Sequence, residues 1–229
     1  RQPAWTLREA LSFLHHPTPD VPLATLEDRS HPAWQRLKAE ELLAQQLSQL
    51  QSKRERDRLR APVLKPACPE PVEGLRQAQP DRHLSLHEQL LAALPFQLTA
   101  AQRRVGEEIA RDLARAVPMH RLLQGDVGSG KTVVAALAAA IAMDAGWQCA
   151  LMAPTEILAE QHFRKLIGWL EPLLAPRGQR VAWLTGSQKK KERTEMLARV
   201  ASGEAALVVG THAVIQDQVQ FKNLALAII

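Results

Sequence analysis

Cysteine is scarce in this sequence, and long uncharged apolar runs are missing. Only two cysteines occur in 229 residues, Cys68 in a proline-rich stretch and Cys149 in an apolar one, so neither a disulfide nor a metal site is predicted. No uncharged apolar run reaches the about 18 residues that predict a membrane-spanning helix. The N-terminal residues also lack the pattern of a secretory signal. We therefore expect a cytoplasmic protein with reduced thiols and no membrane partner.

Bulk composition excludes little beyond this. Hydrophobic residues make up 46% of the chain, which is ordinary for a globular protein with a real core. The formal net charge of +5 is compatible with a polyanionic partner, but a modest basic excess is also found on proteins that bind none. Motifs therefore carry the evidence for function.

The most specific motif is a phosphate-binding loop about halfway along the chain. The stretch LLQGDVGSGKT, residues 122–132, fits the pattern Gly, four residues, Gly, Lys, Thr. Glycines allow successive backbone N–H groups to point into one concavity, which a Cβ atom would obstruct. We expect Lys131 to reach the β and γ phosphates and the Thr132 hydroxyl to bind Mg²⁺. The pattern thus predicts an ATP and Mg²⁺ site formed by Gly125, Asp126, Val127, Gly128, Ser129, Gly130, Lys131 and Thr132, with the last two as its catalytic residues.

The second half of the chain alternates between strand and helix signals. This alternation is typical of an α/β fold with a parallel sheet covered by helices, and apolar stretches such as ALVVG fit a sheet buried on both faces. Right-handed crossovers would place the loops that follow the strands along one rim. We expect strands at HRLLQ, QCALMAP, RVAWLTG, ALVVGT and LALAII, and helices at 84–94, 99–117, 132–145, 156–170 and 188–201.

Proline content divides the chain into predicted parts. Within residues 1–60, one short helix candidate, TLREALSFLHH, lies among prolines, and a long amphipathic helix follows from residue 33. Residues 61–83 hold five of the fifteen prolines, which excludes a continuous helix and predicts a flexible linker or insertion. The remainder, 84–229, forms the predicted α/β domain.

Several motifs resemble those of superfamily 2 helicases. LPFQLTAAQRRVGEEI matches the segment before the phosphate loop, RLLQGDVGSGKTVVA matches motif I, LMAPTEILAEQH matches motif Ia, and VVGTHAVIQDQVQF matches a later DNA-facing motif. Together they most closely resemble the RecG family of bacterial ATP-dependent DNA helicases, with the Mfd translocases as the nearest alternative. The resemblance is close over about residues 94–229. It is looser over residues 1–60, which resemble the end of the RecG wedge domain and a helical linker.

This resemblance implies a fold, an activity and further site residues. It implies a RecA-like P-loop NTPase lobe preceded by a mainly helical region, in a helicase that remodels branched DNA and stalled replication forks in recombination and repair. Gln102 matches a glutamine that recognises adenine, and Phe96 is a second candidate for contact with the base, with a core position as its alternative.

The resemblance also implies contacts with the DNA backbone along the predicted rim. Thr155 can cap a helix and hold a phosphate, and Gln161 and His162 are secondary candidates on the same helix. The three consecutive lysines, Lys189 to Lys191, are candidates for binding the DNA backbone. The alternative is that they are simply solvated. The full set of DNA candidates is Pro154, Thr155, Lys189, Lys190, Lys191, Gly210 and Thr211.

In the family, a strand resembling LALAII leads into an Asp-Glu-x-His motif, whose acids hold magnesium and position the attacking water. The sequence stops before that motif and before a second RecA-like lobe with its arginine finger. We therefore expect a monomeric piece that binds ATP and DNA but does not hydrolyse ATP or unwind DNA alone. The alternatives are an Mfd-like lobe, a P-loop ATPase without nucleic-acid work, and a non-catalytic nucleotide- or DNA-binding module.

Overall fold

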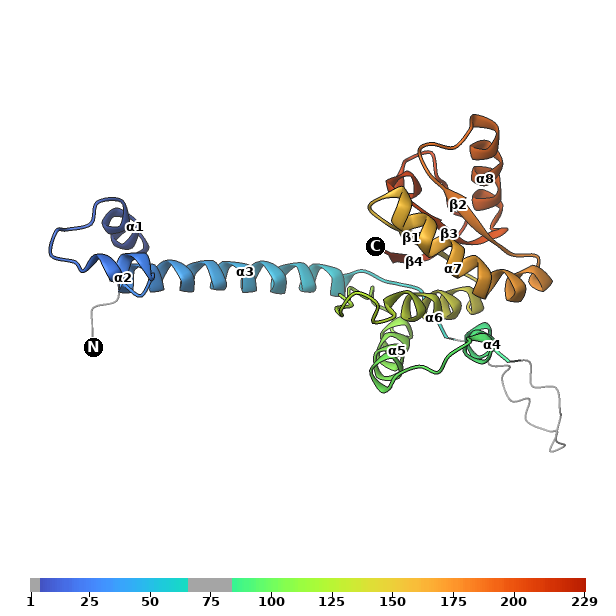
Figure 1. The fold of residues 1–229 in the computed structure, drawn as a ribbon, viewed down its shortest axis with the longest axis horizontal. Helices are drawn as coiled ribbons and strands as arrows, with labels where there is room; N and C mark the ends of the chain where they lie inside the picture. The colour runs from blue at the N-terminus through green and yellow to red at the C-terminus, as the bar shows by residue number, and fades with distance from the viewer. Residues whose placement is uncertain (1–4, 66–83) are drawn as a thin grey trace. The chain divides into compact units, whose positions relative to one another are not determined.

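The computed structural model describes residues 5–65 and 84–229 (Figure 1). It divides into two compact units, Arg1–Leu59 and Arg60–Ile229. Most of the predicted linker lies outside the described residues, as does Cys68, so the three-part division of the chain stays a prediction. Within the described parts, no helix is both long enough and apolar enough to cross a membrane.

The first unit is helical and contains α1 (Leu7–His15), α2 (Leu23–Glu27) and α3 (Pro32–Arg58). Helix α1 begins with a capping box, in which Thr6 Oγ1 accepts from the Glu9 backbone N–H at 3.2 Å and a Glu9 carboxylate oxygen accepts from the Thr6 N–H at 2.8 Å. This helix confirms the TLREALSFLHH prediction. The short α2 was not predicted, because prolines surround it.

Three rings join α1 to the start of α3. The rings of Phe13 and His31 are stacked 4.4 Å apart, and Trp5 contacts both of them edge-on. His31 also caps α3, since its Nδ1 accepts from the Ala33 backbone N–H at 3.1 Å. The packing of α1 against α3 therefore begins at the N-cap of the longer helix.

The predicted apolar face of α3 is partly buried only near the start of the helix, where Trp34 and Leu37 are half-buried. Leu43, Leu47 and Leu50 lie at helical spacing, as predicted, but each is more than half exposed. The helix itself is confirmed, whereas its leucine face stays in contact with solvent in this structure. Helical spacing of apolar residues predicts an apolar face on a helix. Burial of that face also requires another element that packs against it.

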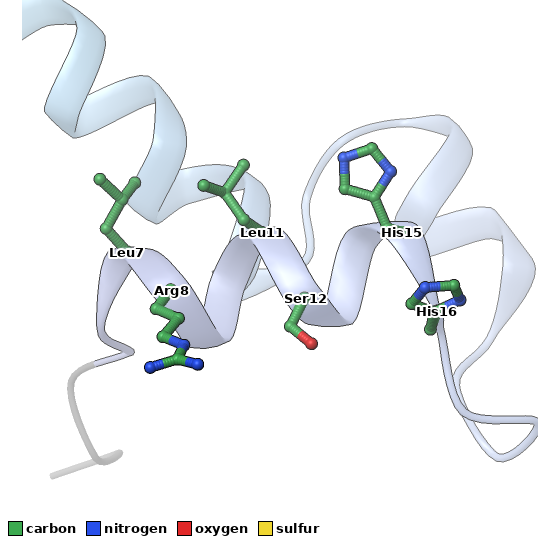
Figure 2. Close-up of a pocket in the computed structure, with 6 residues that line it drawn as sticks. All are labelled: Leu7, Arg8, Leu11, Ser12, His15 and His16. Carbon is green, nitrogen blue, oxygen red and sulfur yellow. The ribbon is translucent and has the colours of Figure 1, made fainter.

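Figure 2 shows a hollow along α1 that is distant in sequence from the phosphate loop. Its lining side chains form two rows with four-residue spacing, so the adjacent histidines belong to different rows. Among the residues that the structure describes, no group of three His, Cys, Asp or Glu side chains is arranged to hold a metal. The rows are Leu7, Leu11 and His15, and Arg8, Ser12 and His16.

The second unit is an α/β domain whose four-stranded parallel sheet has the order β2-β3-β1-β4. This confirms the predicted fold class. Its elements are α4 (Leu86–Ala93), α5 (Ala100–Leu113), α6 (Lys131–Asp144), β1 (Gln148–Met152), α7 (Glu156–Leu174), η1 (Ala175–Arg177), β2 (Arg180–Leu184), α8 (Lys190–Ser202), β3 (Ala205–Gly210), η2 (His212–Ile215) and β4 (Leu224–Ile228).

The sheet separates two apolar cores. Side chains alternate between its faces along each strand, so Cys149 and Leu151 enter one core and Ala150 enters the other. Helices α4, α5, α6 and α7 contribute to the first core, whereas α8 and η2 cover the opposite face (Figure 1). All six residues of β3 are buried, as predicted for a strand covered on both sides. Cys149 is a buried free thiol.

One strand prediction is wrong. The segment HRLLQ, residues 120–124, forms no strand, and β4 lies at the edge of the sheet. The Arg121 guanidinium instead donates to Glu108 at 2.8 Å and to Asp112 at 2.7 Å, which holds this segment against α5. Leu122 is 87% exposed, whereas Leu123 packs against the larger core. The apolar pattern predicts a buried strand, but only part of this segment is buried.

The carboxyl ends of β2 and β3 approach each other closely at Gly210. A Cβ atom added there would lie 1.8 Å from the backbone oxygen of Leu184 and 2.8 Å from a methyl carbon of Val214. Glycine is therefore required at this position by space, and its backbone φ is not in the left-handed region. The rim predicted from the sequence begins at these strand ends.

Candidate nucleotide site and the adjoining rim

The phosphate-binding loop leads directly into α6. Gly128 and Gly130 have φ angles of +83° and +82°, which glycine adopts without a steric cost. A Cβ on Gly130 would also lie 2.3 Å from Gln102 Nε2, and one on Gly125 would lie 2.8 Å from Ser129 Oγ. The glycines thus allow the tight curvature that a phosphate cradle needs, at the positive N-terminal end of a 14-residue helix.

Lys131 folds back over this loop. Its Nζ donates to the backbone oxygens of Gly125 at 2.7 Å and Asp126 at 2.8 Å. These carbonyls hold the ammonium inside the curve of the loop, where phosphate oxygens can replace them as acceptors. The residues therefore fit a nucleoside triphosphate, while the contact of Lys131 with the β and γ phosphates stays a prediction.

Gln102 lies beside the loop. It belongs to the capping box of α5. Its side-chain Oε1 accepts from the Thr99 backbone N–H at 2.9 Å, and its backbone N–H donates to Thr99 Oγ1 at 3.2 Å. Its Nε2 donates to the Ser129 backbone oxygen at 2.9 Å. The side chain thereby joins the start of α5 to the phosphate loop, while its contact with adenine stays a prediction.

Phe96 lies in the turn before α5 and keeps an open surface. Its ring contacts Trp169 of α7 edge-on, with 6.2 Å between the ring centroids, and it is 46% exposed. The ring is therefore packed on one side and accessible on another. Both predicted roles, packing on the base and packing in the protein, are compatible with this position.

The Thr132 hydroxyl has a partner that sequence reasoning did not connect to it. Thr132 Oγ1 lies 3.3 Å from Nδ1 of His162 on α7. Burial lowers the pKa of His162 below its ordinary value, and the positive charge of Lys165 lowers it further. The sequence marked His162 only as a secondary DNA candidate, because no local pattern shows that two residues on different helices meet.

The rim begins where β1 and β3 end side by side. The Ala153 N–H donates to the Gly210 backbone oxygen at 2.9 Å, so Pro154 and Thr155 follow one strand end while Thr211 follows its neighbour. Thr155 is exposed and caps α7 by accepting from the Leu158 N–H at 3.3 Å, as predicted. Thr211 differs, because only 4% of it is exposed. Both DNA contacts stay predictions.

The three lysines lie at the start of α8 on the same rim. Lys189 is the N-cap residue of α8, Lys190 and Lys191 open its first turn, and all three are exposed. The preceding loop is joined to α7 by Ser187 Oγ, which donates to Glu156 at 3.1 Å. The lysines therefore follow a loop that is hydrogen-bonded to the helix capped by Thr155.

Arg193 connects the lysine helix to the third rim segment. Its guanidinium donates to the backbone oxygen of Thr185 at 3.0 Å and to the side-chain oxygen of Gln216 at 2.8 Å. The segments that follow β1, β2 and β3 are thus linked by side-chain hydrogen bonds. Sequence reasoning did not identify Arg193, since only the fold brings these segments together.

The sequence is similar to known helicases. Residues 99–229 match the DEAD/DEAH box helicase family. The ATP-dependent DNA helicase RecG of Escherichia coli strain K12 is 50% identical over 224 residues, which cover 98% of this chain and 29% of that protein. RecG of Pasteurella multocida is 48% identical over 225 residues, with 98% and 30% covered.

A solved structure agrees with this relationship. The structure of RecG bound to a three-way DNA junction superposes with a TM-score of 0.68 at 34% sequence identity, covering 95% of this chain and 30% of that one. The chain thus spans about 30% of the length of these relatives. The resemblance to RecG expected from the motifs is confirmed, and the chain belongs to the DEAD/DEAH box helicase family.

Proposed function

We propose that this chain supplies the ATP-binding and DNA-binding part of a RecG-type helicase, which remodels branched DNA in recombination and repair. The observation that carries the proposal is the contact between Thr132 of the phosphate loop and His162 of α7, the helix that Thr155 caps at the rim. One rigid element therefore touches both the nucleotide site and the DNA-facing candidates. The relative bound to a three-way junction supports branched DNA as the partner.

At the nucleotide site, the loop from Gly125 to Gly130 would surround the phosphates with backbone N–H groups. Lys131 would transfer its hydrogen bonds from the loop carbonyls to phosphate oxygens, and Thr132 would hold Mg²⁺. When bound, the metal neutralises charge on the phosphate oxygens. Gln102 joins α5 to this loop, and we propose that Gln102 and Phe96, in the turn before α5, contact the adenine base.

Binding and hydrolysis are separable in this proposal. Phosphoryl transfer requires carboxylates that position water and hold metal, and an arginine that stabilises the transition state. The motifs assigned to ATP in this sequence contain no such carboxylate pair. We propose that the 229 residues bind ATP and DNA as a monomer, and that hydrolysis uses further groups besides the motifs assigned to ATP.

The DNA part of the proposal is tested by replacing Lys189, Lys190 and Lys191 together with alanine. We expect affinity for a synthetic three-way junction to fall by about tenfold at low salt. The slope of log affinity against log salt should lose about two to three units, because each phosphate contact contributes about 0.9. Fluorescence anisotropy of a labelled junction at several salt concentrations measures both quantities.

The matched control replaces Lys53, Arg54 and Arg58 of α3 with alanine, which removes the same charge from the other unit. This variant should retain the original salt slope. Equal losses in the two triple variants would show that only net charge matters and would refute the assignment of the rim. Failure of the unaltered chain to bind any DNA at low salt would favour a P-loop ATPase without nucleic-acid work.

A further inference from the structure

His162 occupies a position from which it can control the Thr132 hydroxyl. The two side chains come from different helices, α7 and α6, and meet at 3.3 Å in a partly buried setting. We infer that His162 is a positioning residue, which fixes the Thr132 hydroxyl in the orientation needed to hold magnesium. This inference rests on the proposed nucleotide site and adds a residue that the motif itself does not contain.

The hydroxyl group of Thr132 can both donate and accept hydrogen bonds. Threonine has one O–H donor and two acceptor lone pairs, and its hydrogen rotates to suit the neighbours. A lone pair faces a cation only when the hydrogen points elsewhere. In the tautomer that carries its proton on Nε2, His162 Nδ1 accepts that hydrogen at 3.3 Å and leaves the lone pairs of Thr132 free. Partners of this kind orient metal ligands in many proteins.

The ring of His162 is held by the packing of its helix. Ala159 and Leu166 on either side of it along α7 are fully buried, and the next residue, Phe163, packs on Trp183 with 5.1 Å between ring centroids. The backbone of His162 therefore has a fixed place relative to the sheet, and its half-buried ring extends from it to Thr132. An acceptor carried on a packed helix restricts the hydroxyl rotor more than one on a mobile loop would, which favours a positioning role.

The test compares His162→Asn with His162→Leu in the 229-residue chain. The Asn side-chain oxygen can occupy the place of Nδ1 and accept the same hydrogen bond, whereas Leu has a similar size and no acceptor. Binding of a fluorescent ATP analogue is measured against Mg²⁺ concentration and again in EDTA. In the His162→Leu variant, we expect the Mg²⁺ concentration that gives half of the maximal increase in analogue binding to rise by about tenfold or more. The Asn variant should stay close to the original, and affinity in EDTA should be unchanged in both.

Other outcomes separate the two levels of the proposal. An unchanged Mg²⁺ dependence in the Leu variant, or an equal loss in Leu and Asn, would overturn the positioning role while leaving the nucleotide site intact. Absence of Mg²⁺-dependent binding in the unaltered chain would instead overturn the proposed function, and the inference with it. Thermal unfolding of each variant shows whether the protein is folded under the conditions of the measurement.

Discussion

Replacing Lys131 with alanine is expected to weaken ATP binding by at least about 100-fold, equivalent to about 2.8 kcal/mol. The ammonium now donates to two loop carbonyls, and phosphate oxygens are stronger acceptors for the same donors. Hydrogen bonds to charged groups contribute about 1.5–3 kcal/mol each, so loss of even one or two of them accounts for this effect. Equilibrium titration with a fluorescent ATP analogue in saturating Mg²⁺ measures the change.

The control for this variant is Lys53→Ala, which removes an exposed lysine from α3. It should bind the analogue as tightly as the original chain does. Both variants should unfold at similar temperatures, because the Lys131 contacts are exposed and contribute little to stability. Retention of full ATP affinity by Lys131→Ala would contradict the assignment of the phosphate loop.

Replacing Gly210 with alanine is expected to lower the free energy of unfolding by more than about 3 kcal/mol. The added methyl would lie 1.8 Å from the Leu184 backbone oxygen, which belongs to the neighbouring strand and cannot rotate away. The β2 and β3 strands would have to separate at the register pair that joins these residues. Chemical denaturation monitored by circular dichroism measures the loss of stability.

The same change at Gly168 provides the control. This glycine lies on the exposed side of α7, and no atom lies within 4 Å of the Cβ that alanine would add. Alanine there should raise stability by about 0.5–1 kcal/mol, since glycine disfavours a helix interior. Similar losses from the two substitutions would show that the close approach at Gly210 does not determine the effect.

The phosphate loop was predictable in detail because its chemistry is local. Left-handed backbone at Gly128 and Gly130, the start of α6 and the position of Lys131 all follow from a few adjacent residues. The strands β1 to β4 were predictable for a related reason. Short apolar runs that alternate with helices indicate buried strands of a parallel sheet. The N-caps at Thr99 and Thr155 were likewise local features and are confirmed.

Features that depend on distant partners were not predictable in this way. Arg121 joins its segment to α5 through ion pairs with residues nine and thirteen positions away, and this segment forms no strand although its apolar pattern predicted one. The meeting of His162 with Thr132 requires the packing of two helices. The burial of Thr211 depends on neighbouring segments at the strand ends. In each case the sequence shows the residue type, but only the fold shows which residue it contacts.

The start of α8 carries a conflict between folding and binding. Backbone dipoles give a helix a positive N-terminal end, yet this helix begins with Lys189, Lys190 and Lys191 and has no side-chain cap. Each unfavourable charge costs about 0.3–1 kcal/mol at such a position. In the DNA complex that we propose, a phosphate would neutralise the lysines and accept hydrogen bonds from the uncapped N–H groups. The start of α8 would then be more stable in the complex than in the free protein.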